Sequence, residues 1–331
     1  HGWSAFLDTN YAFTSALTAG VGVRYARDTK TFSIDIPPSE SSLGNVWTFT
    51  YFTDGPVTSD RSWDGLTPRA YVRYAATPNL NIYASITRGF KAGGFGSFTV
   101  DAPTTIDEYG LVPNGTRADV FAPETIWSEE IGVKGAAFGG KLTFDLTAFH
   151  YRYRNLQTVF FDTALRTQQV VNVGRVIGYG LENSISWRPS RYFDVSGHLT
   201  WTRTEKRGDR DCTTRDCGGL PNPIWSSAGI ATVHRPLGGG EAYLQGEWSY
   251  EGRRRESYDW RGITRRDAYI QLNLRLGYKN DTGLEIVAYV QNLLNAHYVR
   301  GVENGGDLTP ANVWGLSQPR NFGVDLRFRF R

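Results

Sequence analysis

A short polar segment near residue 255 carries side chains that could bind a charged ligand. It interleaves four arginines with two aromatic and two acidic side chains, in the order Arg253, Arg254, Arg255, Glu256, Ser257, Tyr258, Asp259, Trp260 and Arg261. Cations beside aromatic rings can hold an anionic ligand through charge and through stacking. We take Arg253, Arg254, Arg255, Tyr258, Trp260 and Arg261 as the first candidate binding residues. Alternatively, these arginines pair with Glu256 and Asp259.

A second candidate lies in the long polar stretch 92–123. It contains Phe95 and Tyr109, with the acidic pair Asp107 and Glu108 directly before the tyrosine. A long connection that carries aromatic and charged side chains is a common place for ligand contacts. We therefore expect Phe95 and Tyr109 to be binding residues as well.

The two cysteines, Cys212 and Cys217, stand five residues apart in the polar sequence DCTTRDC. This spacing suits a loop disulfide in an oxidising compartment, and we predict one. A metal clip is the alternative, but two thiols supply half of a zinc site and no histidine lies nearby. We therefore predict no metal site.

The remaining chemistry-bearing residues do not form a catalytic pattern. The five histidines are scattered, and no nucleophile, base and orienting group stand at a recognisable spacing. The net charge of +3 gives no reason to expect a nucleic-acid partner. We predict a protein that is not an enzyme and has no cofactor.

The elements that carry these residues are predicted by alternation of apolar and polar side chains. Between residues 268 and 278 the even positions are Ala268, Ile270, Leu272, Leu274, Leu276 and Tyr278, while polar residues stand between them. The pattern resumes over 284–291 and 322–330, and similar runs occur at 142–148, 193–201 and 242–250. A period of two indicates β-strands, and runs of roughly ten residues match strands that cross a bilayer at a tilt.

Composition agrees with a membrane wall made of strands. The mean hydropathy is -0.40 and no run of about eighteen apolar residues occurs, which excludes helical spans. Alternation keeps the average hydropathy of a barrel low. Aromatic residues make up 14% of the chain, as the rings at the two membrane interfaces of a barrel require.

The connections alternate between short turns and long polar stretches, as at the two rims of an outer-membrane barrel. Short turns fall at 77–79, 139–140, 189–190, 237–240 and 280–283, and long stretches at 92–123, 207–223, 256–264 and 295–319. Together they predict an all-β, transmembrane, antiparallel β-barrel wall of about thirteen strands, the first near 3–12. Residues 45–52 do not fit this parity, and we expect them in a protruding hairpin.

An odd number of strands leaves an unpaired edge, which is costly in lipid, whereas bacterial single-chain barrels have even numbers. We therefore expect further strands to precede residue 1. No export signal is visible, which also indicates a missing N-terminal part.

Two motifs resemble TonB-dependent outer-membrane receptors. The sequence GFKAGGF at 89–95 follows an alternating run, and PETIWSEEIGVK occupies 123–134. NVG at 172–174, GLE at 180–182, VQNLLN at 290–295 and the closing strand after Pro319 and Arg320 also match. These motifs have an architectural explanation, since small glycines let backbones approach and polar side chains face a wet lumen.

The resemblance implies that residues 1–331 are one partial barrel domain, from a barrel of about 22 strands. The N-terminal plug and TonB-contacting box of the family, and the first barrel strands, would be missing from this chain. Members end in an aromatic residue that the barrel-assembly machinery recognises, whereas here Phe330 is followed by Arg331.

The resemblance further implies active uptake of a scarce nutrient, most commonly a ferric siderophore, across the outer membrane of a Gram-negative bacterium. The implied partners are TonB, acting through the plug, the nutrient, the barrel-assembly machinery, outer-membrane lipid and lipopolysaccharide. The arginines of 253–261 would hold an anionic ferric chelate or pair with lipopolysaccharide phosphates. A passive porin or oligosaccharide channel is the alternative function, and a soluble β-propeller or sandwich the third interpretation.

Overall fold

The computed structural model describes residues 1–37, 52–53, 55–101, 117–162, 167–207, 222–259, 262–304 and 312–329. In these residues the main element is a sheet of thirteen antiparallel strands, with the order β1-β2-β3-β4-β7-β8-β9-β10-β11-β12-β15-β16-β19. Each strand pairs with the next one along this order. No helix in the described part of the chain is long and apolar enough to span a membrane. The predicted antiparallel strands and their number are confirmed.

The strands of the large sheet are β1 (Gly2–Ala12), β2 (Leu17–Ile34), β3 (Val57–Thr77), β4 (Leu80–Lys91), β7 (Glu124–Ala137), β8 (Leu142–Asp162), β9 (Thr167–Ser190), β10 (Phe193–Arg207), β11 (Trp225–Pro236), β12 (Gly240–Glu251), β15 (Tyr269–Asn280), β16 (Leu284–Gln291) and β19 (Asn321–Phe328). Three separate hairpins are formed by β5 (Gly94–Asp101) with β6 (Arg117–Phe121), β13 (Arg254–Asp259) with β14 (Gly262–Arg266), and β17 (Val299–Asn304) with β18 (Asn312–Leu316).

The register places the apolar residues of neighbouring strands on one face. Leu244 lies opposite Leu276, while Glu241 lies opposite Lys279 on the other face. Residues directly opposite in an antiparallel pair point to the same side, so one row is apolar and the next is polar. The predicted alternation over 270–278 is therefore the pattern that fixes the register.

The apolar face is not covered by other elements of the described chain. The buried hydrophobic side chains in the described residues are few: Ile36, Trp63, Val100, Val173, Val176 and Val287. Strand residues such as Leu276, Val324 and Phe322 are instead exposed, the last by 80%. A water-soluble domain of this length would bury such side chains in a common core. The distribution fits a wall whose apolar face meets lipid.

Aromatic rings on the polar face lie over glycines of the neighbouring strand. Tyr243 lies opposite Gly277, and a Cβ atom added to that glycine would stand 2.1 Å from the tyrosine Cζ. The same arrangement joins Tyr71 to Gly20, Tyr83 to Gly132, Phe149 to Gly180, Tyr151 to Gly178 and Tyr289 to Gly323. These glycines allow large rings to lie flat, which keeps the wall thin.

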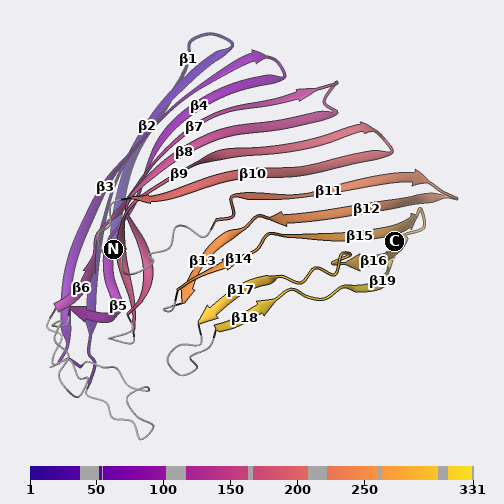
Figure 1. Ribbon diagram of the computed structural model, residues 1–331. Helices are drawn as coiled ribbons and strands as arrows, with labels where there is room; N and C mark the ends of the chain where they lie inside the picture. Colours follow the sequence, from indigo (N-terminus) through magenta and orange to yellow (C-terminus); the bar gives the residue numbers. More distant parts are fainter. Residues whose placement is uncertain are drawn as a thin grey trace, which may run out of the picture.

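The two rims of the sheet differ, as Figure 1 shows: tight turns join strands at one rim, and the three hairpins extend from the other. The turns predicted at 139–140 and 280–283 are confirmed. The turn predicted at 189–190 is wrong, because β9 continues through Ser190 and the chain turns at residues 191–192. Most of the hairpin predicted at 45–52 lies outside the described residues, so it stays a prediction.

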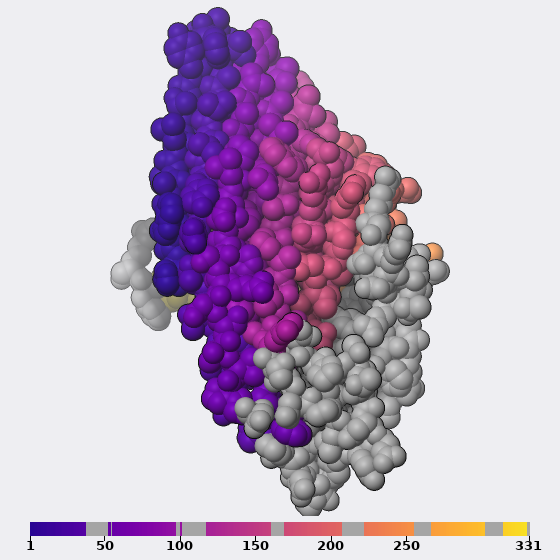
Figure 2. Space-filling view, turned by 90° about the vertical axis from the view of Figure 1, so that its left-hand side faces the viewer, coloured from indigo at the N-terminus to yellow at the C-terminus, as the bar shows by residue number. Residues whose placement is uncertain are grey.

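The sheet is curved but open. β1 and β19 each pair with one neighbour, β2 and β16 respectively, and no described strand joins the two edges. Figure 2 shows the first strands side by side, with indigo β1 at the free edge. The structure is therefore a sector of a barrel wall, with the polar residues on its inner face.

Candidate functional site

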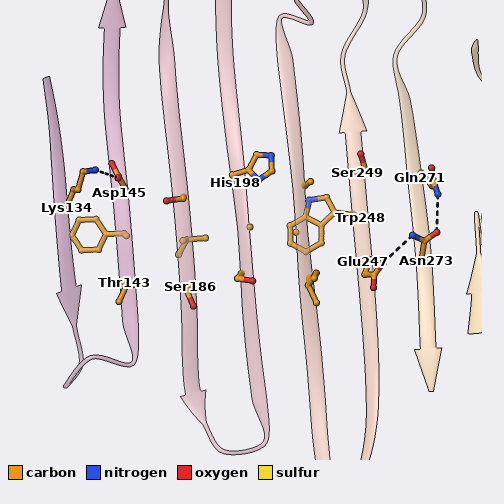
Figure 3. A pocket seen from close by; sticks show the side chains of 18 of the residues that line it. Lys134, Thr143, Asp145, Ser186, His198, Glu247, Trp248, Ser249, Gln271 and Asn273 are labelled. Carbon is orange, nitrogen blue, oxygen red and sulfur yellow. Dashed lines mark hydrogen bonds and ion pairs between the residues drawn. The ribbon is translucent and has the colours of Figure 1, made fainter. Parts of the chain in front are cut away.

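The inner face of the sheet contains a hollow of about 900 Å³, lined by β7, β8, β9, β10, β11, β12 and β15. Figure 3 shows its lining, with Lys134 and Asp145 at one side, Glu247, Asn273 and Gln271 at the other, and Ser186, His198 and Trp248 among the residues between them. The hollow follows from the register, because the side chains that line it from inward positions are polar or small, with Ile230 as the exception. A hollow of this size could hold another molecule.

The first charged cluster joins β7 and β8. The Lys134 ammonium lies 2.8 Å from the Asp145 carboxylate and 5.2 Å from the centre of the Tyr83 ring. Thr147 links the cluster, because its hydroxyl lies 2.7 Å from the Tyr83 hydroxyl and donates to Asp145 at 3.1 Å. These bonds hold the lysine against the wall. Its positive charge is paired with the carboxylate of Asp145.

The second cluster joins β12 and β15. Glu247 accepts hydrogen bonds from Gln245 at 2.7 Å, from Arg275 at 3.2 Å and from Asn273 at 3.3 Å. Gln271 extends the network, donating to Asn273 and accepting from Tyr298, the residue directly before β17. Carboxylate and guanidinium are both only partly exposed. The network therefore stiffens the wall beside the hollow.

The strip between the clusters is built from small side chains on β9, β10 and β11, namely Ser184, Ser186, Ser196 and Ala228. His198 lies among them and is exposed. Within the described part of the chain it makes no side-chain hydrogen bond, so its ring is available to an incoming group. Short side chains leave the backbone wall accessible, which is what the docking of a folded segment or a bulky ligand requires.

The predicted arginine segment is described only in part. Arg253 is exposed and lies 3.4 Å from Asp267. Arg254 points to Glu251, with 3.7 Å between nitrogen and oxygen. The side chains of Arg255 and Tyr258 are not described, and Trp260 and Arg261 lie outside the described residues. Ligand contact by this segment stays a prediction.

Sequence reasoning missed the residues that organise this region. Glu251, the last residue of β12, also accepts from Arg266, which is 5% exposed, at 2.9 Å. Arg266 additionally donates to the carbonyl of Arg300 in β17. Nearby, the rings of Tyr269 and Tyr298 stack at 3.7 Å. The doublet of Arg265 and Arg266 was a visible signal, but only the fold shows which carboxylate it meets.

Phe95, the other predicted contact, packs against the wall. Its ring stacks on Phe32 at 5.1 Å and meets Trp63 edge-on at 5.7 Å. Lys30 lies over the same Trp63 ring and donates to the carbonyl of Gly93 at 2.7 Å. Phe95 thus anchors the β5–β6 hairpin to the wall, a role that its sequence context did not indicate.

The structure does not bring the two predicted contact regions together. Phe95 packs on β2 and β3, whereas Arg253 and Arg254 follow β12, seven strands away from β3 in the sheet order. At the usual spacing of strands this is roughly 34 Å along the wall. Tyr109, Cys212 and Cys217 lie outside the described residues, so the contact and the disulfide predicted there stay predictions.

A protein-family model described as "TonB dependent receptor-like, beta-barrel" matches residues 1–293. Among curated proteins, the pesticin receptor of Yersinia pestis is 22% identical over 340 residues, covering 99% of this chain and 43% of its own.

Many solved structures resemble the whole chain, and two of them illustrate the likeness. The ferric yersiniabactin uptake receptor from Yersinia pestis matches with a TM-score of 0.76 and 19% identity, over 100% of this chain and 46% of that one. The ferric-catecholate import receptor from E. coli K12 matches with a TM-score of 0.74 and 18% identity, over 99% and 44%. At this identity the likeness shows the fold, and the chain spans less than half the length of these relatives.

Proposed function

This chain belongs to the TonB-dependent receptor-like β-barrel family, and from that membership we propose that it forms part of the wall of an outer-membrane receptor for active uptake of a ferric siderophore. The observation that carries the proposal is the contrast between the two faces of the sheet. Exposed apolar residues cover one face, and the other has a polar hollow of about 900 Å³. A wall with lipid on one side and a wet interior on the other is what a receptor barrel needs.

The two open edges support a barrel larger than this chain. β1 and β19 each leave one row of backbone groups without a partner in the described sheet. Such groups cost several kcal/mol each in hydrocarbon. We infer that strands outside these 331 residues pair with both edges and close the barrel.

The hollow supports a plug inside that barrel. The strip of Ser184, Ser186, Ser196 and Ala228 faces the interior, and its short side chains leave the space in front of it unfilled. In each flanking cluster the basic and acidic groups form an ion pair with each other. We infer that a folded plug segment outside this chain docks against the strip, and that TonB acts through that plug. The wall itself is rigid and performs no chemistry.

The relatives support the ligand class. The two solved structures named above are receptors for ferric yersiniabactin and for ferric catecholates. Both ligands are iron chelates, which a bare porin does not concentrate. The long-loop rim, with Arg253 and the Glu251 cluster, is where we expect the chelate to enter.

The test is energised uptake in the organism that encodes the protein. Under iron limitation, cells with the intact gene should accumulate ⁵⁵Fe from one of two probes, ferric yersiniabactin or a ferric catecholate. Deleting either this gene or TonB should abolish that accumulation. Uptake that persists without TonB would contradict the proposal and favour the passive-channel alternative.

A further inference from the structure

Charged side chains appear abruptly on the outer face, at the long-loop end of β7 to β10. The last row that is apolar throughout runs across the strands through Ile131, Ala148, Leu181, Trp201 and Trp225, each directly opposite the next. The rings of Trp201 and Trp225 lie 6.2 Å apart, and Tyr179 meets Trp201 at 5.9 Å. Aromatic rings in such a row mark the interface between hydrocarbon and head groups.

Above this row the outer face becomes basic. The next row contains His150, Tyr179 and Arg203, and in the row after it Arg152 stands between Trp127 and Ile177. In the third row Arg154 lies directly opposite Arg175, and the register continues to Arg207 of β10.

Opposed residues of an antiparallel pair have Cβ atoms about 5 Å apart, and like charges placed there repel. Arg154, Arg175 and Arg203 are all exposed. Among the described residues, none of the three forms a salt bridge. The sheet therefore holds two guanidinium groups at neighbouring positions without an anion of its own between them.

The acidic residues on this surface are engaged elsewhere. Glu129 lies 2.5 Å from both Arg152 and the ring of His150, so it neutralises one arginine. Glu205 lies opposite Ile177 on the same face and has an interaction of its own. The surface thus has two carboxylates, those of Glu129 and Glu205, and four guanidinium groups, those of Arg152, Arg154, Arg175 and Arg203. Its net charge is therefore positive.

We propose that this surface binds the phosphate groups of lipid A, the membrane anchor of lipopolysaccharide, with one phosphate bridging Arg154 and Arg175. The inference rests on the proposed outer-membrane location, which puts the long-loop rim in the outer leaflet, where lipid A replaces phospholipid. A planar guanidinium pairs with phosphate through two parallel hydrogen bonds. A bridging phosphate turns the repulsion between the two arginines into attraction to a common anion.

The test compares three lipids on full-length protein purified in non-ionic detergent. The thermal midpoint is followed while bisphosphorylated lipid A, dephosphorylated lipid A or phosphatidylglycerol is titrated in. Wild type should be stabilised by lipid A at concentrations at least tenfold lower than by either other lipid. The R154Q/R175Q variant should lose tenfold or more in apparent affinity for lipid A. Without lipid it should be as stable as wild type or more so, because the repulsion is gone.

R175Q alone provides a second variant with a smaller loss in the same direction. R235Q is the matched control, because Arg235 also faces outward but at the short-turn rim, opposite Ala242. It should respond to lipid A as wild type does. Unchanged lipid A affinity in R154Q/R175Q would overturn the proposal, as would equal responses to all three lipids. These side chains face away from the lumen, so ⁵⁵Fe uptake should continue in every variant, and loss of the lipid site stays distinguishable from failure of the uptake function.

Discussion

Replacing Gly277 by alanine should destabilise the wall, although only one methyl group is added. The new Cβ would lie 2.1 Å from the Tyr243 Cζ and 2.5 Å from its hydroxyl oxygen. Ordinary contact begins near 3.4 Å, so the ring must retreat by about 1.3 Å. Tyr243 donates to Glu285 at 3.2 Å, and the displacement would strain or break that bond. Overpacking of this kind costs about 1–3 kcal/mol.

Guanidinium unfolding of the full-length protein in detergent, followed by tryptophan fluorescence, measures this cost. The matched control is Gly246→Ala on the partner strand, where a Cβ meets only Leu274 Cδ2 at 3.6 Å. It should leave stability unchanged or slightly raised, since alanine restricts the unfolded chain. In Tyr243→Ala the ring is absent, so adding Gly277→Ala to it should cost far less than in wild type. Equal effects of Gly277→Ala and Gly246→Ala, or full additivity in the double variant, would refute the role of the ring.

Three other predictions test the two faces of the wall. Leu276→Arg on the apolar face should lower the unfolding free energy by about 2–4 kcal/mol in liposomes, whereas Thr200→Arg on the polar face, opposite Glu182, should change it by less than about 1 kcal/mol. Ser196→Trp should fill part of the hollow and reduce ⁵⁵Fe uptake. Val195→Trp, at the neighbouring position that faces outward, should leave uptake unchanged. Equal uptake in both variants would argue against docking of the plug on the serine strip. Glu247→Gln should cost about 1 kcal/mol in guanidinium unfolding, a small value because the ion pair is partly exposed, and no measurable loss would remove the network from the account.

Much of the fold could be predicted from the sequence because each strand has to satisfy lipid and water on opposite faces. The run 268–278 shows this directly, since a slip of one residue would turn Leu272 and Leu274 toward the polar interior. The prediction was less complete for β8, of which only 142–148 was recognised. Its upper half carries His150, Arg152 and Arg154 on the outer face, so the apolar alternation ends although the strand continues.

The candidate site could be predicted less well, because its contacts join residues whose separation depends on register. Arg266 reaches Glu251 across the β13–β14 hairpin, and nothing in the local sequence fixes that pairing. Likewise, the aromatic content indicated rings at the membrane interfaces, whereas several rings lie over glycines on the polar face. Which glycine faces which ring becomes visible only when the strands are aligned.

The most direct test of the central claim is the accessibility of single side chains along β15. Nitroxide spin labels placed in turn at positions 270–278 of the reconstituted protein, with Cys212 and Cys217 replaced by serine, report collisions with oxygen in lipid and with a nickel chelate in water. We predict that even positions such as Leu272 and Leu274 favour oxygen and that Gln271 and Arg275 favour nickel, with a period of two. Equal nickel accessibility at odd and even positions would contradict it.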